Sequence, residues 1–263
     1  MDTRRDDDLV VYTREGPAAL LRINRERKLN ALNRPILDAV MRRLDEVARD
    51  DTVRAVIITG TGRAFCAGAD ITEYWGGGQG AFIEYQRLGR LLLDRVVAHP
   101  TPVIAAVNGF ALGGGFELAL ACDLIVASER ATFGLPEPSL GLVPGGGGTQ
   151  RLARAVGRYR AKDLLLTGRR LSAQEAREWG IIVAIAPEGE EVRAALDLAS
   201  AVARQAPLAT RALKRLVDEG ADAALHTALS YEQQTLIGFY GTADGQEGIT
   251  AFLEKRAPAF TGQ

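Results

Sequence analysis

Mostly apolar runs of five to nine residues recur along the first half of the chain and alternate with longer segments of helical periodicity. The runs are residues 53–60 (VRAVIITG), 101–109 (TPVIAAVNG) and 123–128 (DLIVAS). A strand that is apolar on both faces must be covered on both faces, which is typical of parallel sheets flanked by helices. The amphipathic segment 81–98 is long enough for the crossover that parallel strands need. We therefore expect an α/β fold.

The spacing of apolar residues predicts further elements on either side of these runs. Two short strands are expected at 8–13 and 18–23 around the turn REGP, and a helix at 34–49. After about residue 188 the strand pattern stops, and the apolar spacing and punctuation predict consecutive helices at 190–205, 207–219, 222–239 and 244–255. We therefore divide the chain into a core that carries the active site, 1–190, and a helical region, 191–263.

Composition excludes several classes of function. The 263 residues are 47% hydrophobic and 25% charged with a net charge of −1, so no general positive field attracts nucleic acid. Two cysteines make no disulfide framework, and the N-terminal segment has charges but no apolar stretch typical of a secretory signal. No apolar run approaches the roughly 18 residues that span a bilayer. We expect a soluble, cytoplasmic protein that binds neither membrane nor nucleic acid.

The stretch 109–124 (GFALGGGFELALACDL) places a glycine triplet directly before an apolar helix. The first N–H groups of a helix lack intrahelical partners, and glycines leave them open to a ligand. Such groups favour a phosphate or an oxygen that becomes negative during a reaction. The P-loop and dinucleotide patterns are both absent. Glu117, on the first turn, is either a simple helix-start charge or a functional carboxylate.

Two further segments carry candidate functional residues. Residues 62–74 (GRAFCAGADITEY) offer small residues after a predicted strand, and residues 133–152 (FGLPEPSLGLVPGGGGTQRL) place Glu137 between two prolines that restrict its backbone. Residues 76–80 (GGGQG) indicate a flexible loop. Cys66 is a candidate nucleophile only in principle, because neither His99 nor His226 is placed to serve it. No cluster has metal-ligand spacing, so we expect no metal.

Several long motifs together resemble the enoyl-CoA hydratase/isomerase (crotonase) superfamily, and most closely enoyl-CoA hydratase. They are residues 25–32 (RERKLNAL), 64–71 (AFCAGADI), 106–123 (AVNGFALGGGFELALACD), 133–152, 165–183 and 252–260 (FLEKRAPAF). The resemblance covers about residues 8–260 in order and spacing. It implies a crotonase-like spiral of ββα units with a C-terminal helical region that assembles trimers or hexamers.

The resemblance also implies a reaction and its residues: reversible syn addition of water to a trans-2-enoyl-CoA, giving a 3-hydroxyacyl-CoA. Ala69 and Gly114 match the two amides of an oxyanion hole for the thioester oxygen. Glu117 and Glu137 match the two catalytic glutamates, the first activating water and the second exchanging a proton with Cα. The N–H of Gly145 matches a group that orients the water.

The same resemblance implies how CoA is held, as part of the substrate and without any further cofactor. The backbone around Ala67, Ala69, Asp70 and Ile71 would bind adenine and the pantetheine arm. The basic segment Arg27, Lys28 and Leu29 would lie near the phosphates, and Lys255 would reach CoA, in some relatives from a neighbouring subunit.

Departures from the family pattern bear on the acyl pocket and on the phosphates. Phe116 stands where a smaller residue is common, and with Trp75 it is expected to reshape the acyl pocket. Thr72 replaces a lysine that could contact phosphate, and Pro138 replaces an aliphatic residue.

Other functions stay open beside hydration. An enoyl-CoA isomerase of the same fold would shuttle a proton with Glu137 alone, and a non-catalytic protein would bind CoA thioesters or RNA. β-Oxidation, aromatic degradation and polyketide supply are all compatible pathways.

Overall fold

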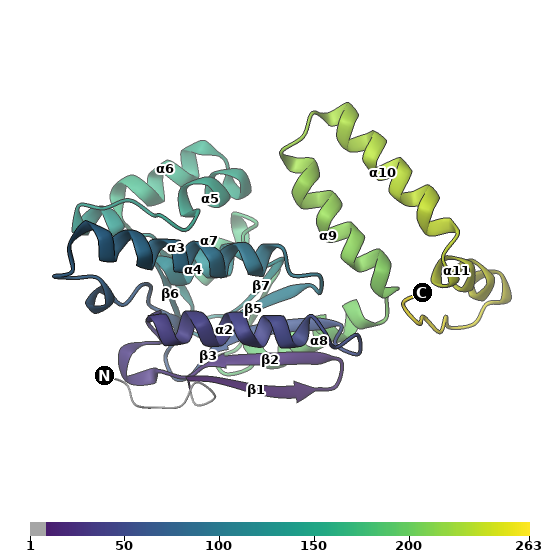
Figure 1. Cartoon of the computed structure of the whole chain (residues 1–263), viewed down its shortest axis with the longest axis horizontal. Coiled ribbons are helices and arrows are strands. Elements are labelled where there is room, and N and C mark those ends of the chain that lie inside the picture. The colour runs from purple at the N-terminus through teal and green to yellow at the C-terminus, as the bar shows by residue number, and fades with distance from the viewer. Residues whose placement is uncertain (1–8) are drawn as a thin grey trace.

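The computed structural model describes residues 9–263. Residues 1–8, which hold the start of the first predicted strand and half of the N-terminal segment that lacks a secretory signal, lie outside the described residues. Within residues 9–263 the elements alternate between strands and helices as far as residue 203, and only helices follow (Figure 1).

In the described chain, six strands form the main sheet in the order β1-β2-β3-β5-β7-β10. β1 runs antiparallel to β2, and every other neighbouring pair is parallel. The bounds are Val10–Glu15 (β1), Ala18–Ile23 (β2), Ala55–Gly60 (β3), Val103–Val107 (β5), Leu124–Ser128 (β7) and Ala184–Ala186 (β10). The three apolar runs are therefore β3, β5 and β7, adjacent in the interior of the sheet, as their sequence predicts.

Successive residues of these strands point to opposite faces, and both faces are covered. Leu20, Ile57 and Ile104 pack with α8 (Glu191–Ala203) on one side. Their neighbours Leu21 and Ile58 belong to the larger core on the other side, which includes residues of α2 (Arg34–Val47), α3 (Gly78–Val97) and α4 (Gly114–Ala121). This double burial explains why the runs carry almost no polar residues.

A second, smaller sheet runs in the order β4-β6-β8-β9 among the described residues. Its strands are Ala64–Cys66, Phe110–Leu112, Thr132–Gly134 and Leu171–Ser172. Each of β3, β5 and β7 is followed closely by a strand of this sheet and then by a helix, which confirms the spiral of ββα units. The chain approaches β4 closely at Gly109, where a Cβ would lie 2.1 Å from the Arg63 carbonyl oxygen, and residues 110–112 pair with β4.

The remaining helices complete the body and then leave it. α5 (Gly148–Val156), α6 (Arg158–Thr167) and α7 (Ala173–Glu178) belong to the body, and α9 (Pro207–Ala221), α10 (Leu225–Tyr240) and α11 (Ala243–Glu254) extend away from it (Figure 1). The glycine loop expected at 76–80 is shorter than predicted, because Gly78 and Gly80 begin α3. Among the described residues, no helix has the length and apolar character that crossing a membrane requires. The division at residue 190 stays a prediction.

Candidate active site

One cavity of about 160 Å³ collects most of the predicted site residues from segments that are far apart in sequence. It lies among α3, the start of α4 and the segments 67–71 and 136–146. The predicted residues that line it are Ala67, Ala69, Ile71, Gly114, Glu117, Glu137 and Gly145.

Ala69 and Gly114, the two residues predicted to supply oxyanion-hole amides, line the same cavity. Ala69 forms a parallel bridge with Leu32 whose hydrogen bonds run from Leu32 N–H to the Gly68 carbonyl (2.8 Å) and from Asp70 N–H to the Leu32 carbonyl (2.9 Å). In this pattern the N–H of Ala69 points away from Leu32. Gly114 is the first residue of α4, so its N–H has no intrahelical partner. A Cβ on Gly114 would lie 3.6 Å from the Ala69 nitrogen, so the two residues lie close together beside the cavity.

Glu117 is held by a neighbouring loop rather than by its own helix end. Its Oε1 accepts hydrogen bonds from the N–H groups of Gly146 and Gly148, both at 2.8 Å, and the residue is only 5% exposed. Burial raises the pKa of Glu117, while the two N–H groups and the charge of Arg151 oppose the rise. A Cβ on Gly146 would lie 2.7 Å from Glu117 Oε2, and one on Gly148 would lie 3.0 Å from Oε1, so a side chain at either position would press on the carboxylate.

Glu137 begins a 3-10 turn, Glu137–Leu140, and has fewer partners than Glu117. Its Oε2 is buried and has no hydrogen-bond partner among the described residues. Burial, and then the negative charge of Glu117, raise the pKa of Glu137 to about 7. The residue facing it is Gly113, in a left-handed conformation with φ 52°, and a Cβ there would lie 3.0 Å from Glu137 Oε1. A carboxyl group titrating near neutrality can both give and take a proton.

Arg151 ties the glycine loop in place and was not identified from the sequence. The Arg151 guanidinium donates to the Gly146 carbonyl oxygen at 2.7 Å. The backbone N–H of Gly146 in turn donates to Glu117. Burial lowers the pKa of Arg151, and its charge lies close enough to that of Glu117 for each to affect the other. The run of glycines followed by an arginine in the sequence was the available signal.

The predicted CoA-binding residues fall into separate groups. Arg27, Lys28 and Leu29 line a surface depression with Arg63 beside the segment that contains Ala67, whose N–H donates to the Leu29 carbonyl at 3.0 Å. The Asp70 side chain does not line the cavity, because it forms a buried ion pair with Arg25 at 2.6 Å.

Lys255 ends α11, which lies apart from α3 and α4 (Figure 1). A single chain therefore does not bring Lys255 to the cavity.

Two expectations about the acyl pocket are wrong for this chain. Phe116 is fully buried and packs against Phe133 with tilted rings whose centroids are 5.2 Å apart, because its position on α4 faces the core instead of the cavity. Trp75 is 83% exposed and does not line the cavity. Thr72 donates its hydroxyl to Asp70 Oδ1 at 2.7 Å and so supports the segment after Ala69.

The remaining reactive side chains have structural surroundings. Burial raises the pKa of Cys66 to about 12, which disfavours the thiolate that a nucleophile requires. The ring of His99 is buried between the carbonyl oxygens of Thr101 and Leu44. Among the described residues, no group of three or more metal-ligating side chains could hold an ion.

Comparison with known proteins places the chain in a family. Residues 13–263 match the family model described as enoyl-CoA hydratase/isomerase. The chain is 41% identical to 2,3-dehydroadipyl-CoA hydratase of Escherichia coli, over 97% of this chain and 99% of that protein. It is 40% identical to short-chain-enoyl-CoA hydratase of Clostridium acetobutylicum, over 94% and 95% of the two chains. The crystal structure of enoyl-CoA hydratase from Bacillus anthracis superimposes with a TM-score of 0.94 at 40% identity, covering 97% of this chain and 100% of the other.

The spiral of ββα units around this cavity is the crotonase fold. The chain belongs to the enoyl-CoA hydratase/isomerase family, whose members are enzymes.

Proposed function

We propose that this chain is an enoyl-CoA hydratase that adds water reversibly, with syn geometry, to trans-2-enoyl-CoA and yields 3-hydroxyacyl-CoA. The observation that carries the proposal is that Glu117 and Glu137 line one cavity together with Ala69, Gly114 and Gly145. Isomerisation needs one proton-transferring group, whereas hydration needs one group for the water and another for Cα.

The proposed chemistry balances within these groups. Glu117, as carboxylate, takes a proton from water while the hydroxyl bonds to Cβ, and the π electrons move onto the thioester oxygen. The N–H groups of Ala69 and Gly114 stabilise that oxyanion, a contribution of roughly 2.7–4 kcal/mol for each donor. Glu137, in its protonated form, delivers a proton to Cα as the enolate collapses. Proton transfer from Glu117 to Glu137 restores the starting state, and the N–H of Gly145 orients the water.

CoA binding and assembly belong to the same proposal. The backbone of residues 67–71 is the site for adenine and pantetheine, and Arg27 and Lys28 supply positive charge for the phosphates. Lys255 would come from a second copy in a trimer or hexamer. No cofactor beyond the CoA carried by the substrate is required. Location in the cytoplasm and a role in β-oxidation or another acyl-CoA pathway remain predictions.

The direct test is hydration of crotonyl-CoA, followed by loss of the absorbance of the conjugated thioester. We expect turnover by the unmodified chain and a loss of about 10²- to 10⁴-fold in Glu117→Gln and Glu137→Gln. Glu178→Gln is the matched control, because Glu178 is an exposed residue on α7 that interacts with Gln174. Full turnover by Glu137→Gln would contradict the assignment, and reaction of 3-enoyl-CoA alone would favour the isomerase.

A further inference from the structure

One side chain beside the cavity holds the loop that in turn holds Glu117. The N–H groups of Gly146 and Gly148 both donate to Glu117 Oε1 at 2.8 Å. Arg151, in the first turn of α5, bonds to this loop twice. Its backbone N–H donates to the Gly147 carbonyl oxygen at 2.8 Å, and its guanidinium donates to the Gly146 carbonyl oxygen at 2.7 Å. The position of both donors to Glu117 therefore depends on Arg151.

The guanidinium occupies space that a glycine leaves open. Gly147 has a left-handed conformation with φ 107°, and a Cβ there would overlap Arg151 Nη1. The Arg151 side chain is partly buried and does not line the cavity. It can therefore act on a bound substrate only through the loop and the carboxylate that the loop holds.

The charge of Arg151 acts on Glu117 in the same direction as the loop. Gly148 is the first residue of α5, so its N–H has no partner within the helix, and the carboxylate lies at the positive end of the helix dipole. Burial raises the pKa of Glu117, whereas the two N–H groups and the charge of Arg151 oppose the rise. Because both N–H groups donate to Oε1, Oε2 is the oxygen left to accept a proton from water.

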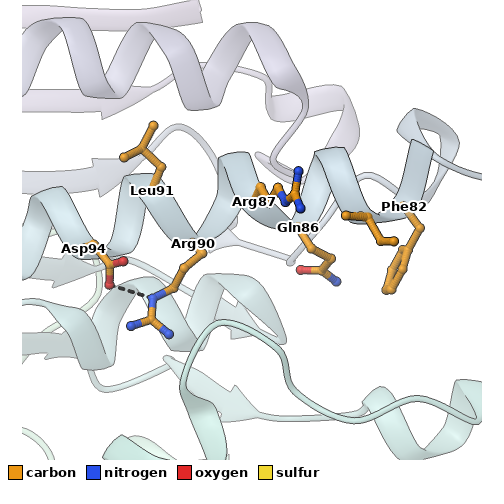
Figure 2. Close-up of a pocket in the computed structure, with 7 residues that line it drawn as sticks. Phe82, Gln86, Arg87, Arg90, Leu91 and Asp94 are labelled. Carbon is orange, nitrogen blue, oxygen red and sulfur yellow. Dashed lines mark hydrogen bonds and ion pairs between the residues drawn. The ribbon is translucent and has the colours of Figure 1, made fainter. Parts of the chain in front are cut away.

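The guanidinium is affected in turn by four charged groups on neighbouring elements: Arg90, Asp94, Glu117 and Asp218. On α3, Arg90 Nε donates to Asp94 Oδ1 at 2.6 Å, so these two charges largely cancel each other (Figure 2). Asp218 lies on α9 and does not line the cavity, whereas Glu117 does. The charge of Arg151 therefore bears on the carboxylate that would activate water.

Resting on the proposed function, we infer that Arg151 is a positioning residue for the addition of water: it fixes the glycine loop against Glu117 and keeps that carboxyl group ionised. A general base must be unprotonated before it can take a proton from water. A buried carboxylate stays ionised when hydrogen bonds and a nearby positive charge compensate for its lost solvation. Arg151 supplies the charge itself and fixes the hydrogen bonds through the Gly146 carbonyl.

The first test measures the ionisation of Glu117 in the free protein, without any substrate. Carbon-13 NMR follows the carboxyl carbons of a chain labelled at its glutamates between about pH 4 and 9. Glu117→Gln and Glu137→Gln assign the two signals, because neighbouring carboxyl groups titrate as a pair. In Arg151→Gln we expect Glu117 to lose its proton at a higher pH than in the unmodified chain. Arg151→Lys keeps the charge and should titrate closer to the unmodified chain.

The second test follows hydration of crotonyl-CoA across the same pH range. Arg151→Gln should lower kcat roughly tenfold near pH 6, as for the loss of a charge-assisted hydrogen bond. KM should change less, because Arg151 does not line the cavity. Since Glu117 must be ionised to act, a higher pKa should also move the acidic limb of kcat/KM to higher pH. A role in stability alone would lower the rate equally at every pH.

Arg154→Gln is the matched control. Arg154 lies one turn later on α5, where its exposed side chain contacts Gln150 and pairs with Asp222. Its replacement removes the same charge from the same helix without touching the loop. The titration of Glu117 and the acidic limb should both stay where they are in the unmodified chain.

A second variant tests the contact if Arg151→Gln does not fold. Gly147→Ala leaves every charge in the chain and pushes the flexible end of Arg151 away from the loop. Glu117 should again lose its proton at a higher pH, and kcat should again fall more than KM changes.

The outcomes separate the two proposals. An unmoved titration of Glu117 in the folded variants, or an equal loss of rate at every pH, overturns the inference and leaves hydratase activity standing. A Glu117 titration that moves to higher pH, in a chain that hydrates no enoyl-CoA, supports the hold of Arg151 on Glu117 and overturns the proposed function.

Discussion

Two glutamates that line one cavity have different surroundings, and this difference agrees with the roles proposed for them. Burial raises the pKa of Glu117, but two backbone N–H donors and a nearby arginine oppose the rise. Glu137 has a buried oxygen without a partner among the described residues and the charge of Glu117 beside it, both of which favour its neutral form. A pair of groups pushed apart in this way can hold one proton, and its titration belongs to the pair.

The pH profile of turnover tests this pairing. The active form carries one proton on the pair, so kcat/KM should fall as pH rises through about 7, where Glu137 loses its proton. The equilibrium constant between enoyl-CoA and 3-hydroxyacyl-CoA does not depend on pH. The kcat/KM of dehydration should therefore fall over the same pH range as that of hydration. Initial rates in both directions between pH 5 and 9 check this, and a profile without a fall above neutrality would contradict it.

The Glu137 carboxyl group should also lower the free energy of unfolding at high pH. The pKa of Glu137 is raised from 4.5 to about 7 in the folded chain. Its contribution to the free energy of unfolding is therefore fully present below pH 4.5 and is lost as pH rises through about 7. Glu137→Gln should therefore raise the free energy of unfolding at pH 8 by about 1–3 kcal/mol, with most of the gain gone by pH 4.5. Urea denaturation at the two pH values measures it. An equal change in the free energy of unfolding at both pH values would mean that Glu137→Gln acts through packing and not through the carboxyl group's titration.

At the scale of elements, glycines set how closely the catalytic segments approach one another. α4 lies against β4 at Gly115, where a Cβ would sit 2.0 Å from the Cys66 carbonyl oxygen. This contact brings the start of α4 to the segment that carries Ala69, so the two predicted oxyanion donors depend on it. Gly146 and Gly148 likewise allow their loop to approach the Glu117 carboxylate closely.

Alanine substitutions separate this role from helix propensity. Gly115→Ala forces a backbone shift and should destabilise the fold by about 3 kcal/mol. Gly89 lies in the interior of α3, and a Cβ added there would have nothing within 4 Å. Gly89→Ala should therefore raise the free energy of unfolding by about 0.5–1 kcal/mol. Denaturation midpoints of the two variants make the comparison. A mild effect at Gly115 would mean that α4 can move away from β4 without cost.

At the scale of the whole molecule, the C-terminal helices present apolar surface that the chain itself does not cover. α10 has no buried residue, and its Leu225, Leu236 and Ile237 are about 70% exposed. Phe252 and Leu253 of α11 are also exposed. Surfaces of this kind on a folded chain are typical of subunit interfaces, which agrees with the predicted trimer or hexamer and with Lys255 acting in a neighbouring copy.

Charge placed on this surface should reduce assembly. Leu236→Glu is expected to lower the mass measured by light scattering after size exclusion and to weaken CoA binding through loss of the partner's Lys255. Gln233→Glu adds the same charge on α10 at a polar, exposed position and should leave the mass unchanged. A monomeric unmodified chain would contradict the predicted assembly.

Local patterns alone determined most elements of the fold. The apolar runs identified β3, β5 and β7 because strands buried on both faces tolerate few polar residues, and apolar spacing placed the C-terminal helices within about three residues of their observed ends. Residue-by-residue resemblance predicted Glu117, Glu137, Ala69 and Gly114 as site residues, and the structure brings all four to one cavity.

Tertiary structure decided what depends on contacts between distant segments. It placed Phe116 in the core rather than the acyl pocket, turned 110–112 into a strand beside β4, and paired Asp70 with Arg25. It also placed Arg151 against the glycine loop that holds Glu117. Sequence periodicity records which residues are buried, but the partner of a buried charge and the direction of a side chain are set by packing between elements that no local pattern contains.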